Sequence, residues 1–178
     1  MVAGPTTQIF QAYLKAQGLD LAKVNITPVD PKDQLTALTA GSVDAIYAFE
    51  PTLTLSESKK VGKIYERGQI NQLYKNPNIG AGYITNDIKL STEKQISLNK
   101  AINKAIVYNK TNPDQALRES ASYLKVEPDL ASKIKKYEYY EIGSEPVQDI
   151  QKFADFLAEI SVIKQKVKID EILYKQKA

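Results

Sequence analysis

Glu50 is the residue whose type and position most strongly suggest chemistry. It follows an apolar segment, residues 43–49, and directly precedes Pro51, a residue that suits the first turn of a helix. The segment has the pattern of a strand buried in a parallel sheet, and such sheets hold their ligands beyond the carboxyl ends of the strands. Glu50 could therefore accept a hydrogen bond from a ligand or repel the wrong anion. Alternatively, its carboxylate caps the helix predicted over residues 51–60, where the helix dipole favours a negative charge.

A second candidate site lies near the beginning of the chain, at Gly4, Thr6 and Thr7. These residues open a predicted helix that ends at Gly18. Free backbone N–H groups at a helix N-terminus bind anions, and two hydroxyl groups add further donors. The three residues therefore suit a sulfonate, carboxylate or nitrate group. Plain N-capping by threonine explains the same pattern, and the two explanations are compatible.

The composition excludes most other chemistry. The chain has 178 residues with no cysteine and no histidine, which rules out disulfides, zinc–thiolate sites, Ser-His-Asp triads and the commonest general base. We therefore expect no catalytic residue, no metal site and no cofactor. The net charge of +3 is spread without a basic stripe, so nucleic acid is not an expected partner. No run of about 18 apolar residues could span a bilayer, and the first ten residues do not have the pattern of a signal peptide.

The elements that would position the candidate residues alternate between strand and helix in the first half of the chain. Strands are predicted at residues 24–29, 43–49, 63–67 and 82–85. Helices are predicted between Pro5 and Gly18, between Asp30 and Gly41, and over residues 51–60. The second half is predicted to be helical. Its helices begin at Ser91 or Thr92 with Gln95 in a capping box, run from Pro113 to about Leu124, cover residues 129–137, and run from Pro146 to Ile160.

Five pieces of sequence follow one another along nearly the whole chain: GPTTQIFQAYLKAQGLDLAKV, DQLTALTAGSVDAIYAFEP, GAGYITND, KAINKAIVYNKTNPDQA and DIQKFADFLAEISVI. Together they resemble the extracytoplasmic solute-binding proteins of bacterial ABC importers, of the nitrate, sulfonate and taurine type. The resemblance implies an α/β fold of the periplasmic-binding-protein type II class, with two lobes. Residues 1–86 would form the second, α/β lobe, and residues 87–178 the helical C-terminal part that returns to the first lobe. Family members are longer at the N-terminus, where most of the first lobe is encoded.

The implied cleft and hinge add further candidate ligand contacts. Phe49 and Tyr83 would lie beside the cleft and could pack on the organic part of a ligand, although such aromatic residues more often belong to a core. Gly82, together with Gly80, could let the crossover strand bend, or could simply belong to a loop. The predicted ligand-binding residues are therefore Gly4, Thr6, Thr7, Phe49, Glu50, Gly82 and Tyr83.

The resemblance predicts a protein that captures a small anionic or organic solute between two lobes and delivers it to an ABC permease in the membrane. Such a protein works outside the cytoplasm, in the periplasm or lipid-anchored at the cell surface, and catalyses no reaction. A ligand-sensing domain of a receptor or regulator is the alternative, because it uses the same architecture. An enzyme of thiamine-pyrimidine synthesis shares this branch of the fold but uses a histidine as reactant, and this chain has none. Apolar faces left exposed by the incomplete first lobe would favour self-association.

Overall fold

Helices joined by irregular segments make up the protein. The computed structural model describes residues 5–75, 82, 90–124, 126–134 and 137–174, and the structural statements that follow concern these residues. None of them belongs to a β-strand.

The first half of the described chain consists of short helices. They are α1 (Pro5–Ala16), η1 (Leu21–Lys23), η2 (Pro31–Asp33), α2 (Gln34–Thr39), α3 (Thr52–Ser58) and α4 (Ile70–Leu73). Local signals set their ends: the Asp30 carboxylate accepts a hydrogen bond from the Lys32 N–H at 3.2 Å, and Gly18 and Gly41 have positive φ angles of 75° and 67°. The three helices predicted for this half are confirmed.

The second half contains longer helices, namely α5 (Thr92–Thr111), α6 (Pro113–Leu124), α7 (Pro128–Lys133), α8 (Val147–Glu159) and α9 (Ile169–Ile172). Ser91 caps α5 as predicted, because its hydroxyl accepts a hydrogen bond from the Lys94 N–H at 3.4 Å. Gln95 does not complete a capping box, since its side chain donates to the Leu90 carbonyl at 2.9 Å instead. The helix predicted over residues 129–137 was too long: α7 ends at Lys133.

The predicted strands at residues 24–29, 43–49 and 63–67 were wrong. No backbone hydrogen bond joins one of these three segments to another, and a strand exists only where such pairs form. The segment 43–49 is also only half-buried or exposed, although its apolar run predicted burial on both faces. The fourth predicted strand lies outside the described residues except for Gly82. The α/β character expected of the second lobe, residues 1–86, is therefore not confirmed.

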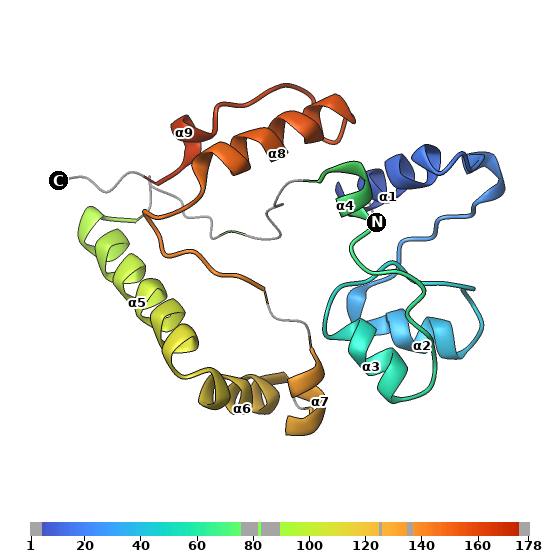
Figure 1. Cartoon of the computed structure of the whole chain (residues 1–178), viewed down its shortest axis with the longest axis horizontal. Coiled ribbons are helices and arrows are strands. Elements are labelled where there is room, and N and C mark those ends of the chain that lie inside the picture. Colours follow the sequence, from blue (N-terminus) through green and yellow to red (C-terminus); the bar gives the residue numbers. More distant parts are fainter. Residues whose placement is uncertain (1–4, 76–81, 83–89, 125, 135–136, 175–178) are drawn as a thin grey trace.

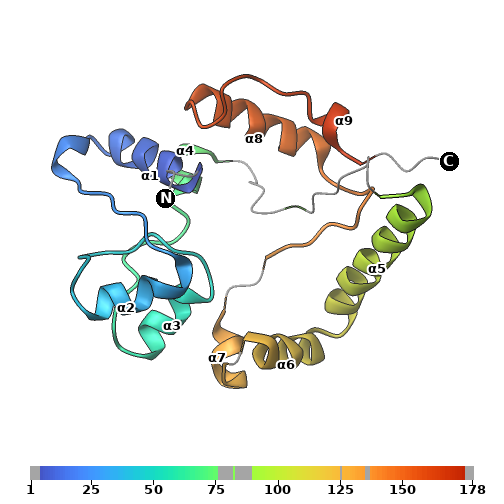
Figure 2. The same cartoon turned by 180° about the vertical axis from the view of Figure 1, so that it is seen from behind.

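Most of the helix contacts join neighbours in sequence: α2 contacts α3, α5 contacts α6, α6 contacts α7, and α8 contacts α9. The contact of α1 with α4 is different, because η1, η2, α2 and α3 lie between the two in the sequence. Figures 1 and 2 show α5 to α7 along one side and the bottom of the view and α1 to α4 along the other side, with α8 and α9 along the top and α8 next to α4. Contacts between α3 and α7 join the two halves of the chain.

An aromatic cluster of Tyr74, Phe153 and Phe156 forms a second connection between the halves. The ring centroid of Tyr74 lies 5.3 Å from that of Phe153 and 5.0 Å from that of Phe156. Tyr74 and Phe153 are both buried, so this cluster attaches the end of α4 to the inner face of α8. It is one of the few places where large apolar side chains are buried in the described chain.

The surface of the molecule is large for its mass. Its accessible area is 13323 Å² for 19.8 kDa, whereas a compact monomer of that mass exposes about 8,600 Å². Burial is correspondingly thin, and none of the large side chains that the structure describes is less than 2% exposed. The described helices include none that combines the length and the apolar character needed to cross a membrane.

Candidate functional site

Glu50 is held by partners on two sides. Its Oε1 lies 2.5 Å from Nη1 of Arg67, and its Oε2 accepts a hydrogen bond from the Thr54 N–H at 3.1 Å. The second contact caps α3, as one of the two explanations for Glu50 predicted. The Glu50 side chain is only 6% exposed, whereas that of Arg67 is 39% exposed. Both oxygens of the Glu50 carboxylate are therefore bonded within the protein. The charged group that is exposed to solvent here is the guanidinium group of Arg67.

The pKa of Glu50 reflects this environment. Burial of the carboxyl group raises the pKa, but the hydrogen bond and charge of Arg67 and the hydrogen bond from the Thr54 N–H lower it by more, so the pKa lies below the ordinary value of 4.5. Glu50 is therefore ionised at neutral pH and carries the negative half of a fixed ion pair.

Sequence reasoning missed Arg67. It lies 17 residues from Glu50, on the irregular segment that precedes α4, so no local pattern links the two side chains. One signal was present, since Arg67 is one of only two arginines in a lysine-rich chain. Arginine presents a planar fork of N–H groups that matches carboxylate and other oxyanions, which lysine cannot do.

Phe49 belongs to a row of four aromatic side chains, which we call the aromatic row: Tyr13, Phe10, Tyr47 and Phe49. Successive ring centroids lie 6.4, 4.9 and 6.2 Å apart, with the first two pairs stacked and the third edge-on. Phe49 is 58% exposed, so it ends the row at the surface and does not belong to a core. The row joins α1 to the segment that leads to Glu50.

The Tyr13 end of the aromatic row is hydrogen-bonded to Glu66, the residue that precedes Arg67. The Tyr13 hydroxyl donates a hydrogen bond to Oε2 of Glu66 at 2.5 Å, and the Gln72 amide donates to Oε1 of the same carboxylate. This hydrogen bond to Glu66, followed by burial, raises the pKa of Tyr13 above 10.0. Glu66 and Arg67 are adjacent in sequence, so one short segment connects with both ends of the row.

The other predicted residues are distributed differently. Thr6 and Thr7 are half-buried in the first turn of α1, so neither is the residue that precedes the helix, and neither hydroxyl bonds to a described residue. Gly82 is exposed, and a methyl group added there would contact no described atom within 4 Å. Gly4, Tyr83 and Gly80 lie outside the described residues. The structure thus joins Glu50 to Arg67 and leaves Phe49, the residue before Glu50, exposed beside Tyr47.

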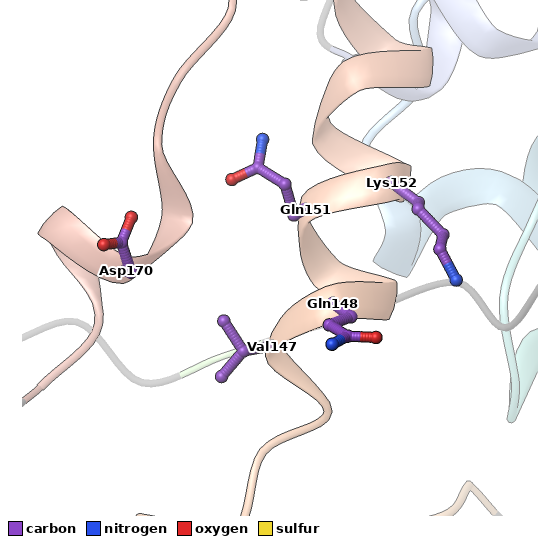
Figure 3. A pocket seen from close by; sticks show the side chains of 5 residues that line it. All are labelled: Val147, Gln148, Gln151, Lys152 and Asp170. Atoms are coloured by element: carbon purple, nitrogen blue, oxygen red, sulfur yellow. The ribbon is translucent and has the colours of Figure 1, made fainter.

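Two cavities of the described chain lie elsewhere. One of about 360 Å³ opens at the start of α8, where Figure 3 shows Gln151 on α8 and Asp170 on α9 at opposite sides. Gln151 joins these elements, because its amide donates to the Val167 carbonyl at 2.9 Å and accepts from the Ile169 N–H at 2.9 Å. A second, of about 260 Å³, is lined by α5, Ile142, Gly143 and Tyr174. Neither cavity includes a predicted site residue.

The carboxylates of the described chain do not gather into a metal site. No group of three or more aspartate or glutamate side chains lies close enough to hold an ion in the part that the structure describes. The charged groups around Arg67 instead form fixed pairs with donors of the protein.

Comparison with known proteins places the chain in a family. The family model described as "NMT1/THI5 like" matches residues 1–116. A "Putative aliphatic sulfonates-binding protein" of Bacillus subtilis (strain 168) is 26% identical over 162 residues, a match that covers 84% of this chain and 46% of the relative. The chain thus spans less than half the length of this curated relative. No solved structure matches the chain. The NMT1/THI5-like family has the periplasmic-binding-protein type II fold and includes ABC solute-binding proteins of the nitrate, sulfonate and taurine type. Because the family model covers more than half of the chain, this protein belongs to that family.

Proposed function

We propose that this protein is the solute-binding component of an ABC importer and that its solute is a small organic sulfonate or a related anion. The observation that carries the proposal is the family match over residues 1–116, together with a relative whose name specifies aliphatic sulfonates. The same match supports a binding protein over an enzyme. A ligand-sensing domain would bind the same kind of solute and would differ in the segment to which it is joined.

The chemistry of the candidate site is compatible with such a solute. Arg67 is a half-exposed guanidinium anchored by a buried carboxylate, and guanidinium groups bind oxyanions through charge-assisted hydrogen bonds. Phe49 offers an exposed apolar face on the residue next to Glu50. In this proposal Glu50 acts through Arg67, while Gly4, Thr6, Thr7, Gly82 and Tyr83 contribute further contacts to the solute.

The remaining parts of the proposal follow from the family. Residues 1–86 correspond to the second lobe, and residues 87–178 correspond to the helical part that returns to the first. Closure of two lobes over the solute would shift an equilibrium between open and closed forms. The protein would work outside the cytoplasm and would deliver the solute to a membrane permease.

Direct titration tests the proposal. Purified protein would be titrated calorimetrically with 1-heptanesulfonate, p-toluenesulfonate, taurine and nitrate, with the matched carboxylate heptanoate and neutral heptanol as controls. Saturable binding of a sulfonate, with no binding of the neutral control, supports the proposal. A sulfonate at 100 times its Kd should also stabilise the fold by about 2.7 kcal/mol. Failure of every anion to bind or to raise the melting temperature would overturn it.

A further inference from the structure

The cavity of about 260 Å³ in the second half of the chain is built on one face of α5. Four of its lining residues belong to this helix: Ile96, Asn99, Lys100 and Asn103. Their spacing of three and four residues places them on the same side of the helix. The rest of the lining comes from residues 142–143 and from Tyr174, which follows α9. Common small-molecule sites have volumes of about 300–1,000 Å³, so this cavity suits a small ligand.

Asn103 holds the wall of the cavity that faces α5. Its Nδ2 donates a hydrogen bond to the Ile142 carbonyl at 3.2 Å, and its Oδ1 accepts one from the Ile142 N–H at 2.7 Å. The next N–H along the chain, that of Gly143, donates to Oε2 of Glu145 at 2.8 Å. Because these bonds fix the wall before a ligand arrives, binding requires little ordering of this segment.

Lys100 brings a positive charge to the cavity, and this charge has no ion-pair partner among the residues that the structure describes. The positions three and four residues away on α5 are occupied by Ile96, Ser97, Asn103 and Lys104, none of which is acidic. The helix as a whole contains four lysines and one glutamate. A positive potential on this face of α5 favours an anionic ligand.

The nearby carboxylates do not cancel this charge. None of the described residues that line the cavity is acidic. Glu145 accepts the hydrogen bond from the Gly143 N–H, and Glu141 lies 3.9 Å from the ammonium group of Lys110. Glu93, on α5 itself, precedes Lys100 by seven residues, or about 10 Å along the helix axis, a distance at which exposed charges are largely screened.

We propose that this cavity is a binding site for a small organic monoanion, a carboxylate or a sulfonate. Lys100 and the side-chain amide of Asn99 both donate hydrogen bonds, and each lies on the same helix face, so together they receive the charged group. Ile96 and Ile142 supply apolar surface for the body of the ligand. One lysine in the lining matches a single negative charge.

This site is separate from Glu50 and Arg67, neither of which lines the cavity. The inference therefore does not rest on the proposed function, since it depends only on the lining of this cavity. An occupant would contact α5, the segment at residues 142–143 and the residue after α9 at once. Binding should thus stabilise the packing of the second half of the chain.

Titration of isotope-labelled protein with sodium benzoate, followed by NMR, tests the site. The backbone amides of Ile142 and Gly143 and the side-chain amide of Asn99 should shift saturably. Benzamide has nearly the same shape without the charge, and acetate has the charge without the apolar body, so each should bind at least about 5-fold more weakly. A parallel titration with benzenesulfonate separates the two oxyanions: saturable binding of either supports the site, and the tighter ligand identifies the class.

Two lysines of α5 provide matched variants. Lys100→Gln should weaken benzoate by about 5- to 10-fold, between the values for an exposed ion pair and a charge-assisted hydrogen bond. Lys94→Gln removes the same charge from the same helix at an exposed residue that does not line the cavity, and should change the affinity by less than about 2-fold. Lys100→Arg keeps the charge and should bind within about 3-fold of the wild type. Circular dichroism confirms that each variant is folded.

Several results would overturn the site. Equal weakening by Lys100→Gln and Lys94→Gln would show a diffuse attraction to α5 and no defined site. Benzamide binding as tightly as benzoate would remove the role of the charge. If neither anion shifts the amides of Ile142 and Gly143 saturably, the cavity is not an anion site. Shifts confined to the amides of Thr54 and Arg67 would assign the anion to the first half of the chain, which overturns this inference and leaves the proposed function standing.

Discussion

The contact between Glu50 and Arg67 should contribute measurably to stability, and Glu50→Gln is the substitution that isolates it. Glutamine has nearly the same shape, and its carbonyl oxygen can still accept the hydrogen bond from the Thr54 N–H that caps α3. The loss is therefore the charge-assisted contact with Arg67, 2.5 Å away in the wild type.

The size of the effect follows from the exposure of the two partners. A hydrogen bond to a charged group contributes about 1.5–3 kcal/mol, whereas fully exposed ion pairs contribute about 0–1 kcal/mol. Glu50 is 6% exposed but Arg67 is 39% exposed, which places this pair between the two cases. We expect Glu50→Gln to lower the free energy of unfolding by about 1–2 kcal/mol at pH 7, equivalent to about 2–8 °C in melting temperature.

The pH dependence of this loss identifies its cause. The pKa of Glu50 is lower in the folded protein than its ordinary value of 4.5, so the carboxylate stabilises the fold fully above pH 4.5. That contribution disappears as the pH falls through the lower, folded-state pKa. The difference between the wild type and Glu50→Gln should thus be constant from pH 8 to pH 5 and shrink below pH 4.5. Urea unfolding followed by far-ultraviolet circular dichroism at several pH values measures it.

Glu57→Gln is the matched control, because Glu57 lies on α3, the helix that Glu50 caps, is exposed, and accepts one hydrogen bond that a glutamine can retain. It should change stability by less than about 0.5 kcal/mol. The reasoning would be refuted if Glu50→Gln matched this control at pH 7, or if its effect stayed unchanged at pH 3.

Three further substitutions test other contacts by the same urea assay. Tyr74→Phe should stabilise the protein by about 1 kcal/mol or more, because the buried hydroxyl has no hydrogen-bond partner among the described residues. Asn103→Leu should cost about 1–3 kcal/mol, because its amide bonds to both the N–H and the carbonyl of Ile142, at 2.7 and 3.2 Å. Ser91→Ala should cost about 1 kcal/mol, because the hydroxyl that caps the Lys94 N–H is lost.

Each of these has an outcome that contradicts it. Destabilisation by Tyr74→Phe would mean that the hydroxyl has a partner. For Asn103→Leu, unchanged hydrogen exchange at the Ile142 amide would show that this contact does not hold the segment to α5. Ser97→Ala, an exposed position inside the same helix as the Ser91 cap, should be neutral. An equal loss in both serine variants would show that the loss in Ser91→Ala does not come from capping, because alanine is the better helix former inside the helix.

Helix ends could be read from the sequence because their signals are local. Asp30 and Ser91 bond to backbone groups two and three residues further on, and Gly18 and Gly41 end helices by their own conformation. Strands could not be read in the same way. An apolar run such as residues 43–49 indicates that a segment avoids water, but pairing depends on a second segment that the run itself does not specify.

The candidate site shows the same limit. Glu50 was identified from its place after an apolar segment and before a proline, and its capping role was one of two open explanations. Its partner Arg67 is 17 residues away, and Phe10, which supports Tyr47 behind Phe49, comes from α1. The types of these residues are visible in the sequence, but their juxtaposition arises only from the path of the chain.

The large accessible surface of the folded chain determines how steeply its free energy of unfolding falls with urea concentration. An unfolded chain of 19.8 kDa exposes about 28,700 Å², so folding to 13323 Å² hides about three quarters of the area that a compact protein of this mass would hide. The slope of the unfolding free energy against urea concentration scales with that hidden area. The slope should be about three quarters of the usual value, so a given change in stability shifts the transition midpoint by about 30% more than it would in a compact protein.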